Sequence, residues 1–166
     1  MTTASSGHVI LERMTPTELE AYLQPAIAEY AQDRVTAGNW SPAEARERAA
    51  GQFAELLPQG VATPDQHLFM IRDGVSRQTV GVIWLAVLAH FGQPTAFIYD
   101  LRIFDAFQRQ GYGAQAMLAI EQEARALGMD RIGLHVFGHN QAAQALYLKL
   151  GYTITNINMV KRLEPV

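Results

Sequence analysis

The sequence of 166 residues contains no cysteine. This absence excludes disulfide bonds, thiolate metal ligands and a cysteine nucleophile, so any covalent catalysis would need another residue. The sequence also lacks a run of about 18 apolar residues, the length that a membrane-spanning helix requires. Residues 1–7 are small and polar, without the basic segment and apolar core of a secretory signal. The sequence therefore predicts a soluble, cytoplasmic protein with no membrane partner.

Basic residues are too few and too scattered for a nucleic-acid surface. The chain has 13 Lys and Arg against 16 Asp and Glu, which gives a net charge of -3. Because nucleic-acid binding depends on clustered positive charge, no nucleic-acid partner is expected, and any anion site must be local. With 49% hydrophobic residues and no repeat or linker, the chain is expected to form one domain over residues 1–166.

Two capping signatures predict consecutive helices near the N-terminus. Thr15-Pro16-Thr17-Glu18 is a capping box with proline at the first helical position. The helix that follows is expected to bend at Pro25 and to stop at Gly38. Ser41-Pro42-Ala43-Glu44 repeats the signature and predicts a second helix that ends before Pro58.

The rest of the chain alternates between strand and helix patterns. Gly111 to Leu127 predicts a helix with Met117, Ile120, Ala124 and Leu127 on one apolar face and Gly128 as its stop. The other expected elements are strands at 8–11, 68–71, 80–87, 96–104 and 131–136, a helix at 140–150, and one or two strands within 152–163. The Asp73-Gly74 turn predicts that the strands at 68–71 and 80–87 are antiparallel.

The most informative stretch is Gln108-Arg109-Gln110-Gly111-Tyr112-Gly113-Ala114, which joins a predicted strand to the long helix. Backbone N–H groups at a helix start are unpaired and carry the positive end of the helix dipole. Glycines at 111 and 113 allow a phosphate to approach the backbone closely. The turn therefore predicts a pyrophosphate cradle.

The same glycines also satisfy the dinucleotide fingerprint G-x-G-x-x-G/A, with Ala116 as its last residue. That reading requires the first glycine directly after the first strand and an acidic residue about 20 positions further on. Here the segment from 105 to 110 intervenes, and residues 131–137 contain no acid. The dinucleotide reading is therefore disfavoured.

Two motifs follow one another in the second half of the chain. The pattern Q/R-x-x-G-x-G/A falls on Gln108, Gly111 and Gly113. The pattern N-x-x-A-x-x-L-Y-x-K-x-G-F/Y falls on Asn140, Ala143, Leu146, Tyr147, Lys149, Gly151 and Tyr152. With both motifs in this order, the chain resembles the GNAT family of acetyl-CoA-dependent N-acetyltransferases, including its ribosomal-protein alanine acetyltransferase branch. The chain departs from the common pattern at Gln108, where many members carry arginine, and at Asp105, where many carry proline.

The resemblance implies an α/β (α+β) fold of the acyl-CoA N-acyltransferase type. Its central sheet would be mixed and mostly antiparallel, splayed between the fourth and fifth strands, with helices on both faces. The pantetheine arm of acetyl-CoA would pair with the backbone of Leu101, Arg102 and Ile103 in that gap, and one of those N–H groups would polarise the thioester carbonyl. The pyrophosphate would bind residues 109–114, and Asn140 would bind the pantetheine region.

The chemistry of amine acetylation suggests three catalytic candidates. Tyr147 would assist the departing thiolate, either as a hydrogen-bond donor or as an acid whose pKa the site lowers; the alternative is a tyrosine packed in the core. His135 could accept the amine proton, or could be a histidine bonded to the backbone. Asp100 is the rival base, and a salt bridge to Arg102 or Arg131 is its alternative.

No metal site is expected. His135 and His139 are four residues apart, but on a strand and its following turn they would not converge as they would on a helix. Trp40 and Trp84 are most simply packing residues. Tyr22, Tyr30 and Trp40 lie where this family shapes its acceptor pocket, although a helical aromatic stripe usually packs.

The resulting prediction is an enzyme that acetylates a primary amine, of a small molecule or of a peptide N-terminus, by direct attack in a ternary complex. The alternative is a non-catalytic acyl-CoA-binding regulatory module. The sequence leaves open the acceptor amine, the acyl chain length, the general base, and the choice between a monomer and a homodimer.

Overall fold

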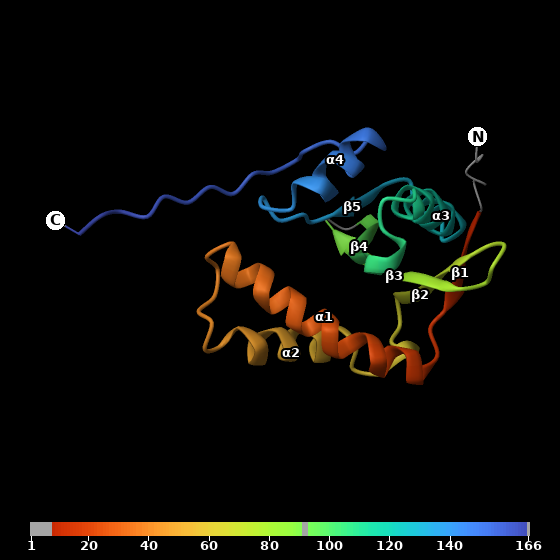
Figure 1. Ribbon diagram of the computed structural model, residues 1–166, viewed down its shortest axis with the longest axis horizontal. Coiled ribbons are helices and arrows are strands. Elements are labelled where there is room, and N and C mark those ends of the chain that lie inside the picture. Colours follow the sequence, from red (N-terminus) through yellow and green to blue (C-terminus); the bar gives the residue numbers. More distant parts are fainter. Residues whose placement is uncertain (1–7, 91–92, 166) are drawn as a thin grey trace.

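The computed structural model describes residues 8–90 and 93–165. The predicted element order is confirmed as far as the last helix (Figure 1). The elements are β1 (Val9–Arg13), α1 (Pro16–Thr36), α2 (Ala45–Leu56), β2 (Gln66–Asp73), β3 (Thr79–His90), β4 (Gln93–Ile103), α3 (Tyr112–Ala126), β5 (Ile132–Leu134) and α4 (Gln141–Lys149), with 3-10 turns at Gly60–Ala62 and Asp105–Phe107. Within the described residues, no helix has the length and apolar character needed to cross a bilayer.

One mixed sheet organises the molecule, with its strands in the order β1-β2-β3-β4-β5. The first four strands are antiparallel to their neighbours, and β5 runs parallel to β4. The β4–β5 pairing joins only residues 96–98 to residues 132–134. Beyond residue 98 the two strands separate, which confirms the predicted splay between the fourth and fifth strands.

Helices cover both faces of the sheet, because the side chains of its strands alternate between two cores (Figure 1). Leu68 and Met70 of β2 join the apolar cluster that contains α1 residues. Phe69 and Ile71 join the cluster that contains α3 residues. The fold is therefore a three-layer arrangement in which α1 and α2 lie on one side and α3 on the other.

Two boundaries differ from the sequence expectation. Of the predicted apolar face of α3, Met117 and Ile120 are fully buried, but Leu127 is 38% exposed. It is the C-cap, outside the helical periodicity, because the chain turns away at the left-handed Gly128. The second helix begins at Ala45, not at the predicted Ser41-Pro42 signature, because residues 42–44 form a turn and no side chain caps the helix.

The expected final strands are wrong. Residues 153–165 contain no helix or strand, and the segment extends away from the body after α4 (Figure 1). The residue types favour a strand, but a strand exists only when a neighbouring strand pairs with it. Within the described part of this chain, the sheet ends at β5 and no further strand joins it.

The capping box at the start of α1 is confirmed and gives a stability prediction. The Thr15 hydroxyl accepts from the Glu18 N–H at 3.2 Å, and the Glu18 carboxylate accepts from the Thr15 N–H at 2.9 Å. Replacing Thr15 by Ala is expected to lower the free energy of unfolding by about 1 kcal/mol, because a helix N–H loses its partner. Urea denaturation measures this. Thr17→Ala, two residues further on and exposed, is the control and should leave the midpoint unchanged.

Candidate functional site

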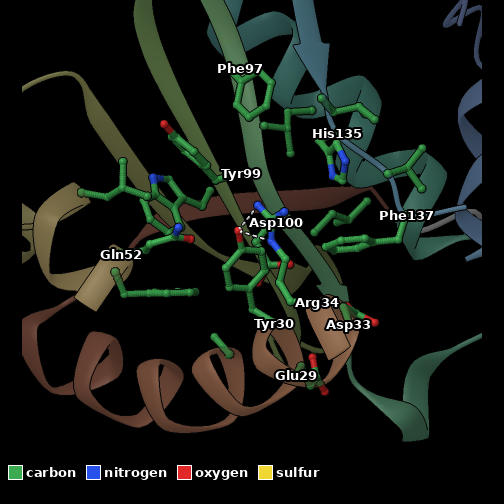
Figure 2. Close-up of a pocket in the computed structure, with 18 of the residues that line it drawn as sticks. Glu29, Tyr30, Asp33, Arg34, Gln52, Phe97, Tyr99, Asp100, His135 and Phe137 are labelled. Atoms are coloured by element: carbon green, nitrogen blue, oxygen red, sulfur yellow. Dashed lines mark hydrogen bonds between the residues drawn. The ribbon is translucent and has the colours of Figure 1, made fainter. Parts of the chain in front are cut away.

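A cavity of about 610 Å³ lies between α1 and α2 on one side and the diverging ends of β4 and β5 on the other (Figure 2). Its position follows from the splay, since the gap between these strands opens where their pairing stops. The lining residues come from six elements and the loops beside them. They are Ala26, Glu29, Tyr30, Asp33, Arg34, Gln52, Phe53, Glu55, Leu56, Trp84, Phe97, Ile98, Tyr99, Asp100, Leu101, Leu134, His135, Val136, Phe137, Asn140 and Tyr147.

Aromatic rings form much of the cavity wall and hold its arginine in place. Arg34 donates two hydrogen bonds to the Tyr30 hydroxyl, at 2.8 Å from Nε and 2.6 Å from Nη2. Its guanidinium also lies 5.2 Å from the ring centre of Trp40 and 5.7 Å from that of Phe137. The positive charge is therefore stacked against the wall and directed at a phenol oxygen (Figure 2).

Four carboxyl groups line the same cavity, at Glu29, Asp33, Glu55 and Asp100. Three of them have partners: Glu29 pairs with Arg102 at 2.8 Å, Asp33 hydrogen-bonds His139 at 2.8 Å, and Asp100 accepts a hydrogen bond from a tyrosine. Acidic side chains beside aromatic faces form an environment that favours a cation. The cavity is thus suited to an organic ligand that carries positive charge.

Asp100 has a different partner from the one expected. Its carboxylate accepts a hydrogen bond from the buried Tyr22 hydroxyl at 2.7 Å. Burial raises the pKa of Asp100, and burial together with the Asp100 charge raises the pKa of Tyr22 well above its usual range. The salt-bridge alternative is wrong, because Arg102 pairs with Glu29 and Arg131 pairs with Asp130 at 3.4 Å.

Tyr147 and His135 line the cavity from the α4 and β5 sides. Burial, followed by the nearby Asp100 charge, raises the pKa of Tyr147 to about 12. Burial and the Arg34 charge lower the pKa of His135, whose ring contacts Phe137 edge-to-face at 4.8 Å between centres. At neutral pH, Tyr147 is therefore a proton donor in hydrogen bonds, and His135 is a neutral imidazole.

The predicted cradle forms the start of α3. Gly111 is the N-cap with φ +85°, and no side chain caps the first turn of this helix. Arg109 also adopts a left-handed conformation, with φ +61°. A Cβ added at Gly113 would lie 3.3 Å from Leu146 of α4 and 3.9 Å from Ile103 of β4. The N–H groups at the start of α3 therefore lie beside the ends of β4 and α4, near the opening of the splay.

Side chains around the cradle fix its shape. The Gln108 amide donates to the Ile103 carbonyl at 3.0 Å and to the Asp105 carboxylate at 3.2 Å, so it braces the loop between β4 and α3. The Gln110 amide donates to the Ala106 carbonyl at 3.2 Å. Arg109 is exposed and provides a positive side chain at the turn.

Tyr112 ties the helix start to the β2–β3 turn, because its hydroxyl donates to Asp73 at 2.9 Å. Asp73 also accepts from the N–H groups of Val75 and Ser76. The Ser76 N–H and the Tyr112 hydroxyl are the largest causes that lower the pKa of Asp73 to about 2. Asp73 is therefore charged at neutral pH, and its carboxylate fixes the position of Tyr112 at the start of α3.

The backbone of β4 and the start of α4 complete the site. Because the Phe104 N–H donates to the Val80 carbonyl, the alternation of the strand turns the N–H groups of Leu101 and Ile103 toward the gap. The Asn140 side chain accepts from the Ala143 N–H at 3.2 Å as the N-cap of α4, and Asn140 also lines the cavity.

Sequence reasoning did not identify most of the cavity wall. The missed residues include Glu29, Asp33, Arg34, Phe97 and Phe137. Alternation of Phe97 and Tyr99 along one strand is a signal that could have marked an aromatic surface. Nothing in the sequence indicated that these rings face α1, since the contacting residues lie far apart along the chain.

Comparisons with known proteins agree with this architecture. The model of the acetyltransferase (GNAT) family matches residues 24–152. The chain is 36% identical to the uncharacterized N-acetyltransferase YycN of Bacillus subtilis (strain 168), over 93% of this chain and 99% of that protein. It is 34% identical to the uncharacterized N-acetyltransferase YdgE of the same organism, over 92% and 97%.

Solved structures extend the comparison. The crystal structure of YycN superposes with a TM-score of 0.89, covering 95% of this chain and 99% of that one at 35% identity. An aminoglycoside acetyltransferase from an uncultured soil metagenomic sample shares the fold at a TM-score of 0.59 and 18% identity, covering 95% and 97%. From its matched residues and these relatives, the chain belongs to the GNAT family of N-acetyltransferases.

Proposed function

We propose that this protein transfers an acetyl group from acetyl-CoA to a primary amine, of a small molecule or of a peptide N-terminus, by direct attack in a ternary complex. The observation that carries the proposal is the convergence of the α3 start, the open edge of β4 and Tyr147 on one gap between β4 and β5. Family membership gives the reaction class. The acidic and aromatic cavity supports an acceptor that is positively charged before it loses its proton.

The residues present fit acetyl-CoA. The uncapped N–H groups at Gly111 to Ala114, with Arg109 beside them, suit a pyrophosphate. Gln108 and Gln110 are proposed to act mainly by holding that loop, and Tyr112 by anchoring it. The edge of Leu101, Arg102 and Ile103 suits the amide-bearing pantetheine arm, and Asn140 lines the cavity together with Leu101.

Acetyl-CoA supplies a thioester whose carbonyl carbon accepts the amine nitrogen. An N–H on the β4 edge would stabilise the oxyanion as the C–N bond forms. His135, neutral at pH 7, would take the proton that the amine loses, directly or through water. Tyr147 would donate a hydrogen bond to the sulfur as the C–S bond breaks and the thiolate leaves.

Replacing His135 by Gln is expected to lower kcat by about 10²-fold and to remove the acidic limb of the pH profile. Since the pKa of His135 is lowered from 6.5, the base is unprotonated above pH 6.5, and activity should be lost as the pH falls below that value. Steady-state kcat between pH 5 and pH 9, with both substrates saturating, measures this.

Asp100→Asn is the matched control for the choice of base. Asp100→Asn should leave the pH of the acidic limb of the kcat profile unchanged, because the Asp100 carboxylate is hydrogen-bonded to Tyr22. A limb that disappears in Asp100→Asn and persists in His135→Gln would assign the base to Asp100. A profile that shifts in neither variant would assign the proton to water.

Thiol release from acetyl-CoA with a panel of amines tests the function itself. The chain contributes no background signal in this assay because it has no cysteine. We expect release with cationic amines that carry an apolar body, and none with the same compounds already N-acetylated. Coenzyme A binding without thiol release in the presence of any amine would favour the regulatory module. Absence of coenzyme A binding would overturn both the enzyme and the regulatory-module hypotheses.

A further inference from the structure

The segment after α4 is strand-like in sequence, but residues 153–165 are exposed and form no helix or strand. We define the tail as residues 153–163, which include Ile154, Ile157, Met159, Val160 and Leu163. These five side chains are between 63% and 92% exposed. Large apolar side chains gathered so densely on one exposed segment usually mark a contact surface. The tail therefore has the composition of a segment that is covered in the functional protein.

Among the described residues, no strand pairs with the outer side of β5. β5 is the last strand in the sheet order, and its three residues pair with β4 on one side only. An edge strand presents unpaired N–H and C=O groups that can accept another strand. This edge also borders an apolar cluster, since Ile132 and Leu134 pack against the same core cluster as Tyr147 of α4 and its C-cap Leu150.

The way the tail leaves the body directs it outward. Gly151 adopts a left-handed conformation, with φ +94°, and the Tyr152 N–H donates to the Tyr147 carbonyl at 3.0 Å. The Tyr152 ring packs on Tyr147 with 5.9 Å between centres, which fixes the exit point. From there the extended tail can span about 35 Å, at roughly 3.3 Å per residue, which is enough to reach another molecule.

We propose that two copies of this chain exchange their tails, so that each tail adds a strand to the β5 edge of the other copy. A second copy is the favoured occupant because every copy carries both the open edge of β5 and a strand-like tail that begins just after α4, and two-fold symmetry satisfies both at once. Charge is compatible with this arrangement, since Lys161 and Arg162 of the tail approach a chain of net charge -3. This inference does not depend on the acetyltransferase reaction.

The exchange would also support the cavity. β5 leads directly into residues 134–137, which line it. Strands on both sides of β5 would hold that wall more firmly than β4 does alone, since only three residue pairs join β4 to β5.

Light scattering after size-exclusion chromatography of the full chain tests the assembly. The expected result is a dimer, with twice the 18.4 kDa of one chain. The double variant Ile157→Lys with Met159→Lys should be monomeric and folded, because both side chains are exposed within one chain. Leu118→Lys, at a 53% exposed apolar position on α3, is the matched control and should remain dimeric. A wild-type monomer at all concentrations, or a dimer that survives the tail substitutions, overturns the proposal.

Cysteine cross-linking distinguishes exchange of tails between two copies from a tail that folds back onto β5 of its own chain. Because the chain has no native cysteine, single-cysteine variants report one contact each. We would mix a variant carrying Arg131→Cys, beside the β5 edge, with variants carrying Cys in place of Ile154, Ile157 or Val160. Disulfide-linked heterodimers from at least one mixture are expected. If instead a chain carrying both changes forms only an internal disulfide, the tail occupies its own edge and the exchange is wrong.

Discussion

Replacing Tyr147 by Phe is expected to lower kcat by about 10²- to 10³-fold while leaving the Kd for coenzyme A within about twofold of wild type. The pKa of Tyr147 is raised to about 12 by burial and by Asp100. Transfer of its proton to a thiolate with a pKa of about 8.5 would be uphill by about 5 kcal/mol. Tyr147 would therefore act by donating a hydrogen bond to the leaving sulfur. The sequence also left open that Tyr147 acts as an acid with a lowered pKa, and its raised pKa disfavours that role.

The control for this prediction is Tyr152→Phe, the aromatic neighbour of Tyr147 on the same apolar cluster. It removes one hydroxyl from the same region without touching the proposed leaving group, so kcat should change by less than about threefold. Single-turnover measurements at saturating acetyl-CoA isolate the chemical step. A Tyr147→Phe enzyme with wild-type turnover would show that Tyr147 only packs.

Replacing Gly111 by Ala is expected to raise the Kd for coenzyme A by about 10- to 100-fold, because one or two charge-assisted hydrogen bonds to the pyrophosphate are lost. Gly111 has φ +85°, and an alanine there would be strained by about 1–2 kcal/mol. The loop would relax toward a right-handed conformation and turn its N–H groups away. The new methyl group meets only the Gln115 amide at 3.9 Å, so steric collision is not the cause.

Gly128→Ala isolates backbone strain from phosphate binding. Gly128 follows the other end of α3, has φ +81°, and a Cβ there would contact nothing within 4 Å. Both variants should lose similar stability in urea, but only Gly111→Ala should weaken coenzyme A binding in calorimetric titration. Equal affinities in the two variants would remove the helix start from the binding site.

Local signals predicted most of the elements correctly. The capping box at Thr15 placed the start of α1, and the buried face of Met117 and Ile120 followed from helical periodicity. The Ser41-Pro42 signature misplaced the second helix because a cap works only when the hydroxyl reaches the backbone, and a turn intervenes here. Signals of this kind are reliable where the interacting groups are within a few residues of each other.

The candidate site was predicted only in part. The motifs marked Gly113, Asn140 and Tyr147, and the structure places Asn140 and Tyr147 on one cavity and Gly113 beside the ends of β4 and α4. Arg34 and Phe137 were not foreseen, although they stack together on its wall. Asp100 was expected to meet an arginine and meets Tyr22. These contacts join residues that are 103 and 78 positions apart, and patterns in a single sequence contain no information on contacts over such separations.

By itself, the sequence determined the element order, the glycine turn before α3, the family resemblance and the types of chemically active side chain, because each depends on neighbouring residues. Only the tertiary structure decided where the sheet splays, which rings and carboxylates face one another across the gap, and that the strand-like tail pairs with no strand in the described part of its own chain. The physical reason is that pairing and burial depend on surfaces brought together from distant segments, whereas propensity acts along the chain.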